Sequence, residues 1–328
     1  MHTTSDSKVL PSLSPRCILH GHVQILRIDH WTKNVFVLPG IAIPLTVLKS
    51  WPDAALLSRM VLGIVSVGLI ASSNYVINEV LDGTYDRLHP TKSSRPVAQG
   101  RVLLPLAYVQ WIAVMMIGLL AASHVNRSFM ITLGILWVMG CIYNIPPVRT
   151  KNVPFLDVLS ESVNNPLRLL AGWYIVGEQL VPPLSLLLAY WMVGGYFMAL
   201  KRFGEFRDIG NQTLAAKYRP SFRSYSERSL LVSAMFYGSA GMLFFGAFIM
   251  RYRMELVLAF PAVALVMAIY LHLAFEPESV VVNPEKLYKE PRLIVSIAAC
   301  VFVIAVLLRY DIPALHRIFV PTLPVAGG

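Results

Sequence analysis

The sequence predicts an all-α integral membrane protein with nine transmembrane helices. Of its 328 residues, 56% are hydrophobic and only 14% are charged, whereas a soluble domain carries about 25% charged residues. The mean hydropathy is +0.60, and the apolar residues are gathered into long runs. Each long run approaches the roughly 20 residues that an α-helix needs to cross the hydrocarbon core of a bilayer.

Nine such segments follow one another along the chain. Five contain no Asp, Glu, Lys or Arg: 102–123, 128–148, 179–200, 229–250 and 256–275. Three are shorter: 34–48, 60–77 and 293–308. The remaining segment, 155–176, is apolar but interrupted by charge. We therefore expect a transmembrane domain over 34–310, preceded by a cytosolic segment 1–33 and followed by a short tail 311–328.

The distribution of cations orients these helices. With nine spans, the N-terminus and the loops after every second span share one side, which carries 20 Lys and Arg residues against 7 on the other. The positive-inside rule places the richer side in the cytosol. The net charge of +10 follows from this bias, so we expect no nucleic-acid partner. Residues 1–33 lack the apolar region of a signal peptide, and three distant cysteines predict no disulfide framework.

An acidic row follows the second span. Asn78, Asp82 and Asp86 recur every four residues, so on a continuing helix they lie along one face. Two carboxylates and an amide offer the oxygen ligands that Mg²⁺ prefers. The sequence therefore predicts a magnesium site at a membrane edge.

A cationic pair comes directly after this row. Lys92 and Arg95 follow within a few residues, and His89 and Pro90 are expected to turn the chain between them and the row. An acidic metal site beside two cations is what the binding of a Mg²⁺-bound diphosphate requires.

A second polar cluster follows the sixth span. Lys201, Glu205 and Asp208 lie at positions i, i+4 and i+7, again on one helical face. Glu205 and Asp208 could hold a second metal ion, while Lys201 and Arg202 could bind phosphate oxygens. Because the second and sixth spans end on the same side of the membrane, both clusters can face one cavity.

The fifth span carries a polar stripe: Asp157, Glu161, Asn164, Asn165 and Arg168. Their spacing places them along one side of a helix. Ionisable groups inside a membrane are expensive unless they are paired or hydrated, so such a stripe lines a cavity or forms a structural polar network. Arg168 is a candidate substrate-binding residue, and Asn164 or Asn165 could bridge it to Glu161.

Two further features lie on the same side. Lys33 and Asn34 stand at the start of the first span, where Lys33 could bind a lipid phosphate or act with Trp31 as an interface anchor. The loop 218–225 mixes aromatic and basic residues, as in an amphipathic lid at the level of the headgroups.

At the acidic row the chain resembles the UbiA-type superfamily of intramembrane prenyltransferases. The motif of that superfamily, Asn-Asp-x-x-Asp-x-x-x-Asp, is matched at Asn78, Asp82 and Asp86, and Glu79 stands where the family usually has Asp. The resemblance implies nine helices around a central cavity open to the cytosol, with acidic motifs after helices 2 and 6 and with Mg²⁺ as cofactor.

Within the superfamily, the segments 31–34, 86–96 and 201–205 look like those of the polyprenyl-phosphate phosphoribosyltransferases. In that branch decaprenyl phosphate attacks C1 of phosphoribosyl diphosphate, an early step toward arabinose donors for cell-wall polymers in a bacterial inner membrane. The resemblance implies the following roles. Asp82, Asp86, Lys201 and Glu205 would be catalytic; Lys33, Asn34, Asn78, Lys92, Arg95, Arg168, Lys201 and Arg202 would bind substrate; Asn78, Glu79, Asp82, Asp86, Glu205 and Asp208 would bind metal.

Two alternatives remain open at this point. The run 143–147 followed by Lys151 resembles branches that prenylate aromatic rings or glycerol lipids, and there Asp157 or Glu161 could act as a base. A more remote alternative is a secondary transporter with a charged fifth span. The expected partners are a polyprenyl lipid and a phosphorylated or diphosphate co-substrate, and no oligomeric state follows from the sequence.

Overall fold

A computed structural model of the chain describes residues 14–48, 51–87, 92–277, 279–282 and 284–319, and these residues form helices and no β-strand. The α-helices are α1 (Pro15–Gln24), α2 (Leu38–Val47), α3 (Ala54–Asp86), α4 (Leu104–Ser123), α5 (Arg127–Asn144), α6 (Leu156–Ser162), α7 (Asn164–Val176), α8 (Leu184–Ile209), α9 (Gln212–Tyr218), α10 (Glu227–Tyr252), α11 (Phe260–Ala274), α12 (Pro291–Arg309) and α13 (Pro313–Ile318). The 3₁₀ helices are η1 (Ile28–Val37), η2 (Lys92–Ser94), η3 (Thr150–Asn152), η4 (Pro220–Ser224), η5 (Met254–Ala259), η6 (Val280–Val282) and η7 (Pro284–Lys289).

Seven helices in the described part of the chain are long and apolar enough to cross a membrane: α3, α4, α5, α8, α10, η5 with α11, and α12. They match seven of the nine predicted spans and indicate an integral membrane protein. The other two segments differ from the single helices that the sequence predicts. The first is divided into η1 and α2, and the fifth into α6 and α7, with a turn at Val163.

The break at Val163 has a local cause. Pro166 has no N–H to donate and disfavours helix in the residues before it. Because α7 begins at Asn164, Pro166 falls in its first turn, where a missing N–H leaves no hydrogen bond unmade. The polar stripe therefore belongs to two short helices, and its two ends need not face the same neighbours.

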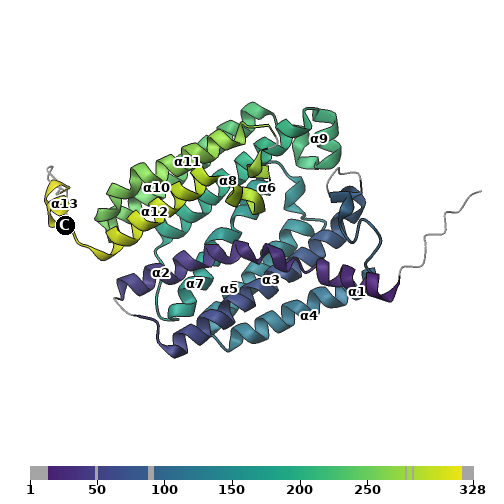
Figure 1. Ribbon diagram of the computed structural model, residues 1–328, viewed down its shortest axis with the longest axis horizontal. Helices are drawn as coiled ribbons and strands as arrows, with labels where there is room; N and C mark the ends of the chain where they lie inside the picture. The colour runs from purple at the N-terminus through teal and green to yellow at the C-terminus, as the bar shows by residue number, and fades with distance from the viewer. Residues whose placement is uncertain (1–13, 49–50, 88–91, 278, 283, 320–328) are drawn as a thin grey trace, which may run out of the picture.

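The helices pack in two groups (Figure 1). The helices α2, α3, α4, α5 and α7 share one apolar core, and α8, α10 and α11 share another with the loops that follow α8. A third core joins the groups through Leu169 and Trp173 of α7, Leu186 of α8 and Leu307 of α12. In Figure 1 both α1 and α9 lie at the right-hand end of the bundle.

The two divided segments touch each other through glycine. A Cβ atom on Gly40 would lie 2.0 Å from the Leu169 carbonyl oxygen, and one on Gly172 would lie 2.1 Å from the Val37 carbonyl oxygen. Only glycine allows backbones to approach this closely. The contact fixes η1 and α2 against α7 in the interior of the bundle.

The helix α3 holds the other side of η1. The Trp31 indole packs against Gly68, where a Cβ would come within 2.6 Å of the ring, and its N–H donates to the Ser72 hydroxyl at 2.9 Å. Trp31 therefore anchors η1 to α3. The same α3 continues without interruption through Asp86, which carries the acidic row on one helix.

Candidate functional site

The acidic row lines a small cavity at one end of α3. Asp82 and Asp86 face a volume of about 50 Å³. The other residues lining it are Tyr85, Lys92, Arg149, Lys151, Asn152, Tyr218, Arg219 and Pro220.

Asp82 is neutralised by two cations. Its Oδ1 atom accepts from Arg149 Nη2 at 2.8 Å and from Lys151 Nζ at 2.6 Å. Lys151 also donates to Asn144 Oδ1 at 3.0 Å, and Asn78 Nδ2 donates to the same oxygen at 2.5 Å. Burial lowers the pKa of Lys151 to about 8, although Asp82 opposes that shift. Asn78, Asp82 and the loop after α5 thus form one connected cluster.

The second carboxylate of the cavity pairs with the predicted cationic loop. Arg95 Nη1 lies 2.6 Å from Asp86 Oδ2. Lys92 donates to the Tyr218 hydroxyl and lies 4.6 Å from the centre of the Tyr218 ring. Burial, with the nearby Arg219, lowers the pKa of Lys92 to about 7 against the opposing effect of Glu205. His89 and Pro90, expected to turn this loop, lie outside the described residues.

Glu79 faces away from the acidic row. It is 1% exposed, and its Oε2 atom accepts from Arg27 Nη2 at 2.9 Å, while Oε1 accepts from the Val97 N–H at 3.3 Å. One residue along an α-helix turns the side chain by about 100°, so Glu79 points to a different side from Asn78. Its contacts join α3 to the chain before η1.

Arg202 lies at the centre of a second network. It is 1% exposed, and its guanidinium binds Asp157 Oδ2 at 3.2 Å, Glu205 Oε2 at 3.1 Å and the Glu161 carboxylate. The Tyr143 hydroxyl donates to Glu161 at 2.7 Å. These contacts use all three nitrogens of Arg202, so this side chain organises the carboxylates of α6 and α8.

Asp157 ties down the loop that follows α8. It is fully buried and accepts from Tyr225 Oη at 2.6 Å, Ser221 Oγ at 3.3 Å and Arg219 Nη1 at 3.4 Å. This loop, residues 210–226, contains the segment 218–225 that was predicted as a lid, and it brings Tyr218 and Arg219 to the cavity at Asp82 and Asp86. Its aromatic residue Phe222 is buried in the core of the second helix group.

The remaining predicted site residues lie elsewhere. Lys33 and Asn34 stand on η1, Lys201 stands one residue before Arg202 on α8, and Arg168 stands on α7. Glu161, expected beside Arg168, pairs instead with Arg202. Asp208 is exposed in the last turn of α8 and is not among the residues that line the cavity.

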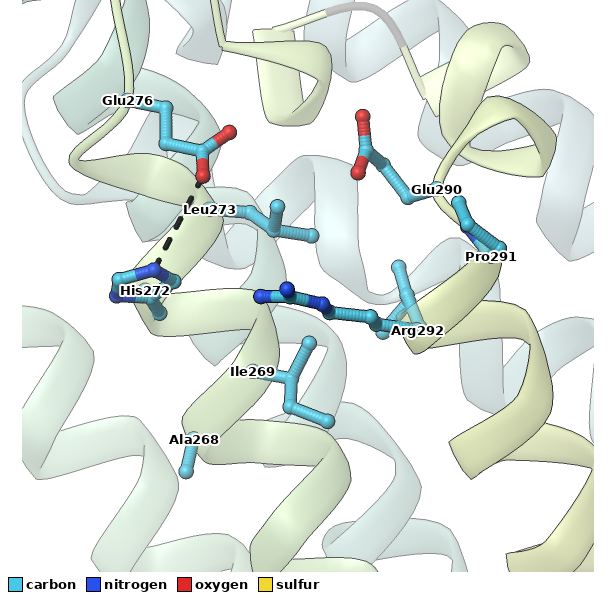
Figure 2. A pocket seen from close by; sticks show the side chains of 9 residues that line it. Ala268, Ile269, His272, Leu273, Glu276, Glu290, Pro291 and Arg292 are labelled. Carbon is cyan, nitrogen blue, oxygen red and sulfur yellow. Dashed lines mark ion pairs between the residues drawn. The ribbon is translucent and has the colours of Figure 1, made fainter.

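A larger groove lies between α11 and α12 and has a volume of about 490 Å³. Figure 2 shows Arg292 reaching from α12 toward His272 and Leu273 of α11. His272 and Glu276 are 3.9 Å apart and both well exposed. None of the predicted site residues lines this groove, so it is separate from the acidic row.

Sequence reasoning missed part of the acidic cavity. Asn144 is the last residue of α5, Arg149 and Lys151 follow that helix, and Tyr218 and Arg219 follow α8, all far from Asp82 in the chain. A signal was available, since these residues follow the fourth and sixth spans, which end on the same predicted side as the second. The sequence did not show which of the basic residues on that side contact Asp82.

The donor set suits a hard divalent cation. Asn78, Asp82 and Asp86 supply an amide and two carboxylates, the oxygen ligands preferred by Mg²⁺. No group of three or more His, Cys, Asp and Glu side chains gathers at one point in the described chain. The carboxylates are instead held by Arg95, Arg149 and Lys151, and these cations would share or release them when a metal ion binds.

The fold and the cavity define a class: a helical membrane protein with paired acidic and basic groups at one end of its bundle. The UbiA prenyltransferase family matches residues 35–282 of the chain. The protein belongs to this family and is a UbiA-type transferase.

Known relatives agree with this assignment. The chain is 30% identical to decaprenyl-phosphate phosphoribosyltransferase of Corynebacterium glutamicum over 237 residues, which cover 69% of this chain and 66% of that protein. It is also 30% identical to the enzyme of the same name from Mycolicibacterium smegmatis, covering 66% of each chain. The matched region is thus just under two thirds of the length of both relatives.

The fold is shared with a solved structure. A UbiA homologue from Archaeoglobus fulgidus, bound to GPP and Mg²⁺, superposes with a TM-score of 0.66 and 21% identity. The match covers 87% of this chain and 99% of that one. At this identity the likeness establishes the common fold.

Proposed function

We propose that the protein transfers 5-phosphoribose from phosphoribosyl diphosphate to a polyprenyl phosphate and releases diphosphate. The observation that carries this proposal is the cavity at Asp82, where two carboxylates and an amide are surrounded by cations from three loops. Carboxylates suit a metal ion, and the surrounding cations suit the phosphate oxygens that the metal ion leaves uncovered. The names of the two bacterial relatives favour phosphoribose as the transferred group.

The proposed topology follows the family. The divided segments η1–α2 and α6–α7 complete nine spans around a central cavity, and the N-terminus and the acidic row face the cytosol of a bacterial inner membrane. The excess of Lys and Arg on that side supports this orientation.

The residues of the cavity receive distinct roles. Asn78, Asp82 and Asp86 would hold Mg²⁺, which, when bound, neutralises the charge that develops on the departing diphosphate. Arg149 and Lys151 would then pass from Asp82 to the diphosphate oxygens. Lys92, Arg95 and Arg219 would bind further oxygens from the facing loops. Glu79 is left out because both of its oxygens are engaged on another side of α3.

The second network would position these groups. Arg202 holds Glu161 and Glu205 in place, and Asp157 holds the lid whose Arg219 reaches the cavity. Arg202 therefore acts as a positioning residue, because its nitrogens are already bound to carboxylates.

In the proposed reaction an oxygen of the lipid phosphate forms a bond to C1 of the ribose, and the bond from C1 to diphosphate breaks with its electron pair leaving on diphosphate. The lipid phosphate is already anionic, so no strong general base is needed. The cations around Asp82 stabilise the leaving group, and the largely apolar bundle excludes water from the cation-like C1 centre.

A second candidate function is prenyl transfer from a polyprenyl diphosphate to an aromatic or hydroxyl acceptor. The solved homologue with bound GPP and Mg²⁺ favours it. The transporter alternative is set aside, because the family to which the chain belongs consists of transferases.

One assay distinguishes phosphoribosyl transfer from prenyl transfer: diphosphate release by the purified protein with Mg²⁺. One reaction contains phosphoribosyl diphosphate and a polyprenyl phosphate, and the other contains a polyprenyl diphosphate and an aromatic acceptor. We expect release in the first reaction only. Release in the second reaction only would replace phosphoribosyl transfer with prenyl transfer.

A further inference from the structure

The helices α3 and α5 present amide side chains to each other on two successive turns. Asn74 of α3 packs over Gly140 of α5, where a Cβ atom would lie 2.2 Å from the Asn74 Cγ atom. The Asn74 Nδ2 atom donates to the Leu136 carbonyl oxygen at 3.2 Å. One turn further along each helix, Asn78 meets Asn144. The close approach that glycine allows at Gly140 therefore brings these two amides together.

The hydrogen bonds of Asn144 fix which way its own amide points. The side chain is 3% exposed, and both of its polar atoms are bound. Its Nδ2 atom donates to the Gly140 carbonyl oxygen at 2.9 Å. A carbonyl oxygen only accepts, so the atom that faces it must be the amide nitrogen. The Oδ1 atom therefore faces the other way, where it lies 3.0 Å from Lys151 Nζ and 2.5 Å from Asn78 Nδ2.

The orientation of the Asn78 amide follows from that of Asn144. Because Asn144 Oδ1 has no hydrogen to donate, the Asn78 atom beside it must be Nδ2. Asn78 Oδ1 accepts no hydrogen bond from the described residues, so it remains a free acceptor. An amide binds Mg²⁺ through its oxygen, whereas the NH₂ group would turn its hydrogens toward the cation. The contact with Asn144 thus selects the one amide orientation that serves a metal ion.

This contact does not depend on the cations around the acidic row. Lys151 bridges Asn144 to Asp82, whose Oδ1 atom lies 2.6 Å from Lys151 Nζ. In the proposed reaction Lys151 passes from Asp82 to the diphosphate oxygens. Asn144 stays anchored to the backbone of its own helix through Gly140, so it still accepts from Asn78 when Lys151 has moved. The Asn78 amide therefore keeps its orientation while the neighbouring charges exchange partners.

We propose that Asn144 is a positioning residue of the metal site: it orients the Asn78 amide so that Oδ1 is available to the metal ion, and it does not bind the metal ion itself. This rests on the part of the proposed function that places Mg²⁺ at the acidic row, which phosphoribosyl transfer and prenyl transfer share. A merely structural link between α3 and α5 would instead affect stability and leave the metal requirement unchanged.

The test measures metal-dependent binding and needs no turnover. Radiolabelled inorganic diphosphate, which both candidate reactions release, is bound to the full-length protein in detergent over a Mg²⁺ titration. Asn144→Leu removes the acceptor at similar volume, so the Mg²⁺ concentration for half-maximal binding should rise about 10-fold or more. Asn144→Asp keeps an acceptor for Asn78, although it gives up the donor to Gly140, and should remain near the wild type. Equal losses in the two variants would overturn the proposal.

A second substitution removes the need for orientation. The two oxygens of a carboxylate are equivalent, so in Asn78→Asp the side chain presents an oxygen whichever way it rotates. When Asn144→Leu is added to Asn78→Asp, the Mg²⁺ requirement should therefore rise no further. A rise as large as the one that Asn144→Leu causes alone would overturn the proposal, because Asn144 would then act by a route other than the Asn78 amide.

The matched control is Asn126→Leu, at the opposite end of α5. Asn126 Oδ1 accepts from the Phe129 N–H at 2.8 Å, and Nδ2 donates to the Tyr174 carbonyl oxygen at 2.6 Å. Its replacement should lower the thermal unfolding midpoint, because a helix cap is lost, and leave the Mg²⁺ titration unchanged. A shifted titration in this control would overturn the proposal, since destabilisation alone would then set the metal requirement. Thermal unfolding without ligand identifies the folded variants.

The outcomes also separate this proposal from the proposed function. If diphosphate binding needs Mg²⁺ but is unaffected by Asn144→Leu, the positioning role is wrong and the metal assignment stands. If the Mg²⁺ requirement depends on Asn144 but phosphoribosyl transfer is absent, the positioning role stands and the proposed reaction fails. If wild-type binding does not need Mg²⁺, the metal assignment fails and the positioning role fails with it.

Discussion

At the scale of single residues, the acidic row is held by internal counter-ions. Arg149 and Lys151 occupy one oxygen of Asp82, and Arg95 binds Asp86. When a Mg²⁺-bound diphosphate enters, the metal ion can bind the carboxylates, and the diphosphate oxygens can bind the cations that the carboxylates release. The internal cations hold both carboxylates in place before the substrate arrives.

Glu79 and Asp82, three residues apart on α3, should respond differently when each carboxylate is replaced by the corresponding amide. Asp82→Asn should lower turnover by more than about 100-fold, since it removes a proposed metal ligand, while the protein stays folded. Glu79→Gln should instead lower the stability by several kcal/mol, because it leaves Arg27 without its buried partner. Diphosphate release and thermal unfolding of both variants measure the contrast. Near-normal turnover of Asp82→Asn would rule out the metal assignment.

The buried lysines predict an alkaline limit on diphosphate binding. The pKa of Lys92 is lowered to about 7 and that of Lys151 to about 8. Below these values both are cations that can bind phosphate oxygens, and above them each loses its charge. We expect kcat/KM for the diphosphate substrate to fall as the pH rises from 7 to 9. Lys92→Arg, whose charge persists, should move the lower part of this decline upward. An unchanged profile would exclude Lys92 from binding.

Residue-level predictions from sequence succeed where the signal is local. The alignment of Asn78, Asp82 and Asp86 follows from helical periodicity alone, and α3 does continue through them. Glu79 was predicted to bind metal, although helical periodicity places it about 100° around the helix from Asn78. The partners of Asp82 could not be derived, because Arg149 lies 67 residues away in the chain.

At the scale of elements, the lid and the divided fifth span depend on each other. The turn at Val163 separates α6, whose carboxylates bind Arg202 and the lid, from α7, which carries Arg168. A single straight helix would aim all these side chains along one line. The break therefore allows the two parts of one span to face different neighbours.

Asp157 should control the lid. Asp157→Asn weakens the contacts with Arg202 and Arg219, so we expect the KM for the diphosphate substrate to rise about 10-fold or more and the loop 210–226 to be cleaved faster by protease. Ser221→Ala removes one hydroxyl contact from the same carboxylate and should have a much smaller effect. Equal protease resistance of Asp157→Asn and wild type would show that Asp157 does not hold the loop.

The contact between η1–α2 and α7 should tolerate no side chain. Gly172→Ala places a methyl group about 2.1 Å from the Val37 carbonyl oxygen, so we expect a loss of about 3 kcal/mol or more, because the backbones must separate. Gly134→Ala is the matched control on α5, where a Cβ meets nothing within 4 Å, and it should be neutral or stabilising by up to about 1 kcal/mol. Thermal unfolding in detergent compares the two, and equal midpoints would contradict the close contact.

At the scale of the whole molecule, composition and hydropathy were enough to predict a helical membrane protein and seven of its spans. The sequence described two segments less well, 34–48 and 155–176; both contain proline, as several other spans do, and the second also contains charged residues. Their helices are set by neighbours, through Trp31 on Gly68 and through Arg202 on Asp157 and Glu161. Such long-range contacts leave no periodic trace in a single sequence.

Removal of magnesium should abolish binding of the diphosphate substrate. With EDTA, turnover and the binding of phosphoribosyl diphosphate should be lost, because uncompensated diphosphate would meet Asp82 and Asp86. Equilibrium binding of labelled phosphoribosyl diphosphate over a Mg²⁺ titration measures this dependence, and readdition of Mg²⁺ should restore it. Metal-independent binding would argue against a metal site at the acidic row.

The Arg202 network also bears on how the chain enters the membrane during synthesis. Asp157 and Glu161 give α6 two negative charges, while Lys201, Arg202 and Glu205 give α8 a net positive charge. Left unpaired, these charged side chains would be costly close to the lipid. Together they bury their charges against each other, and a short connection, 177–183, joins α7 to α8. We therefore expect the fifth and sixth spans to insert into the membrane as a hairpin rather than as single helices.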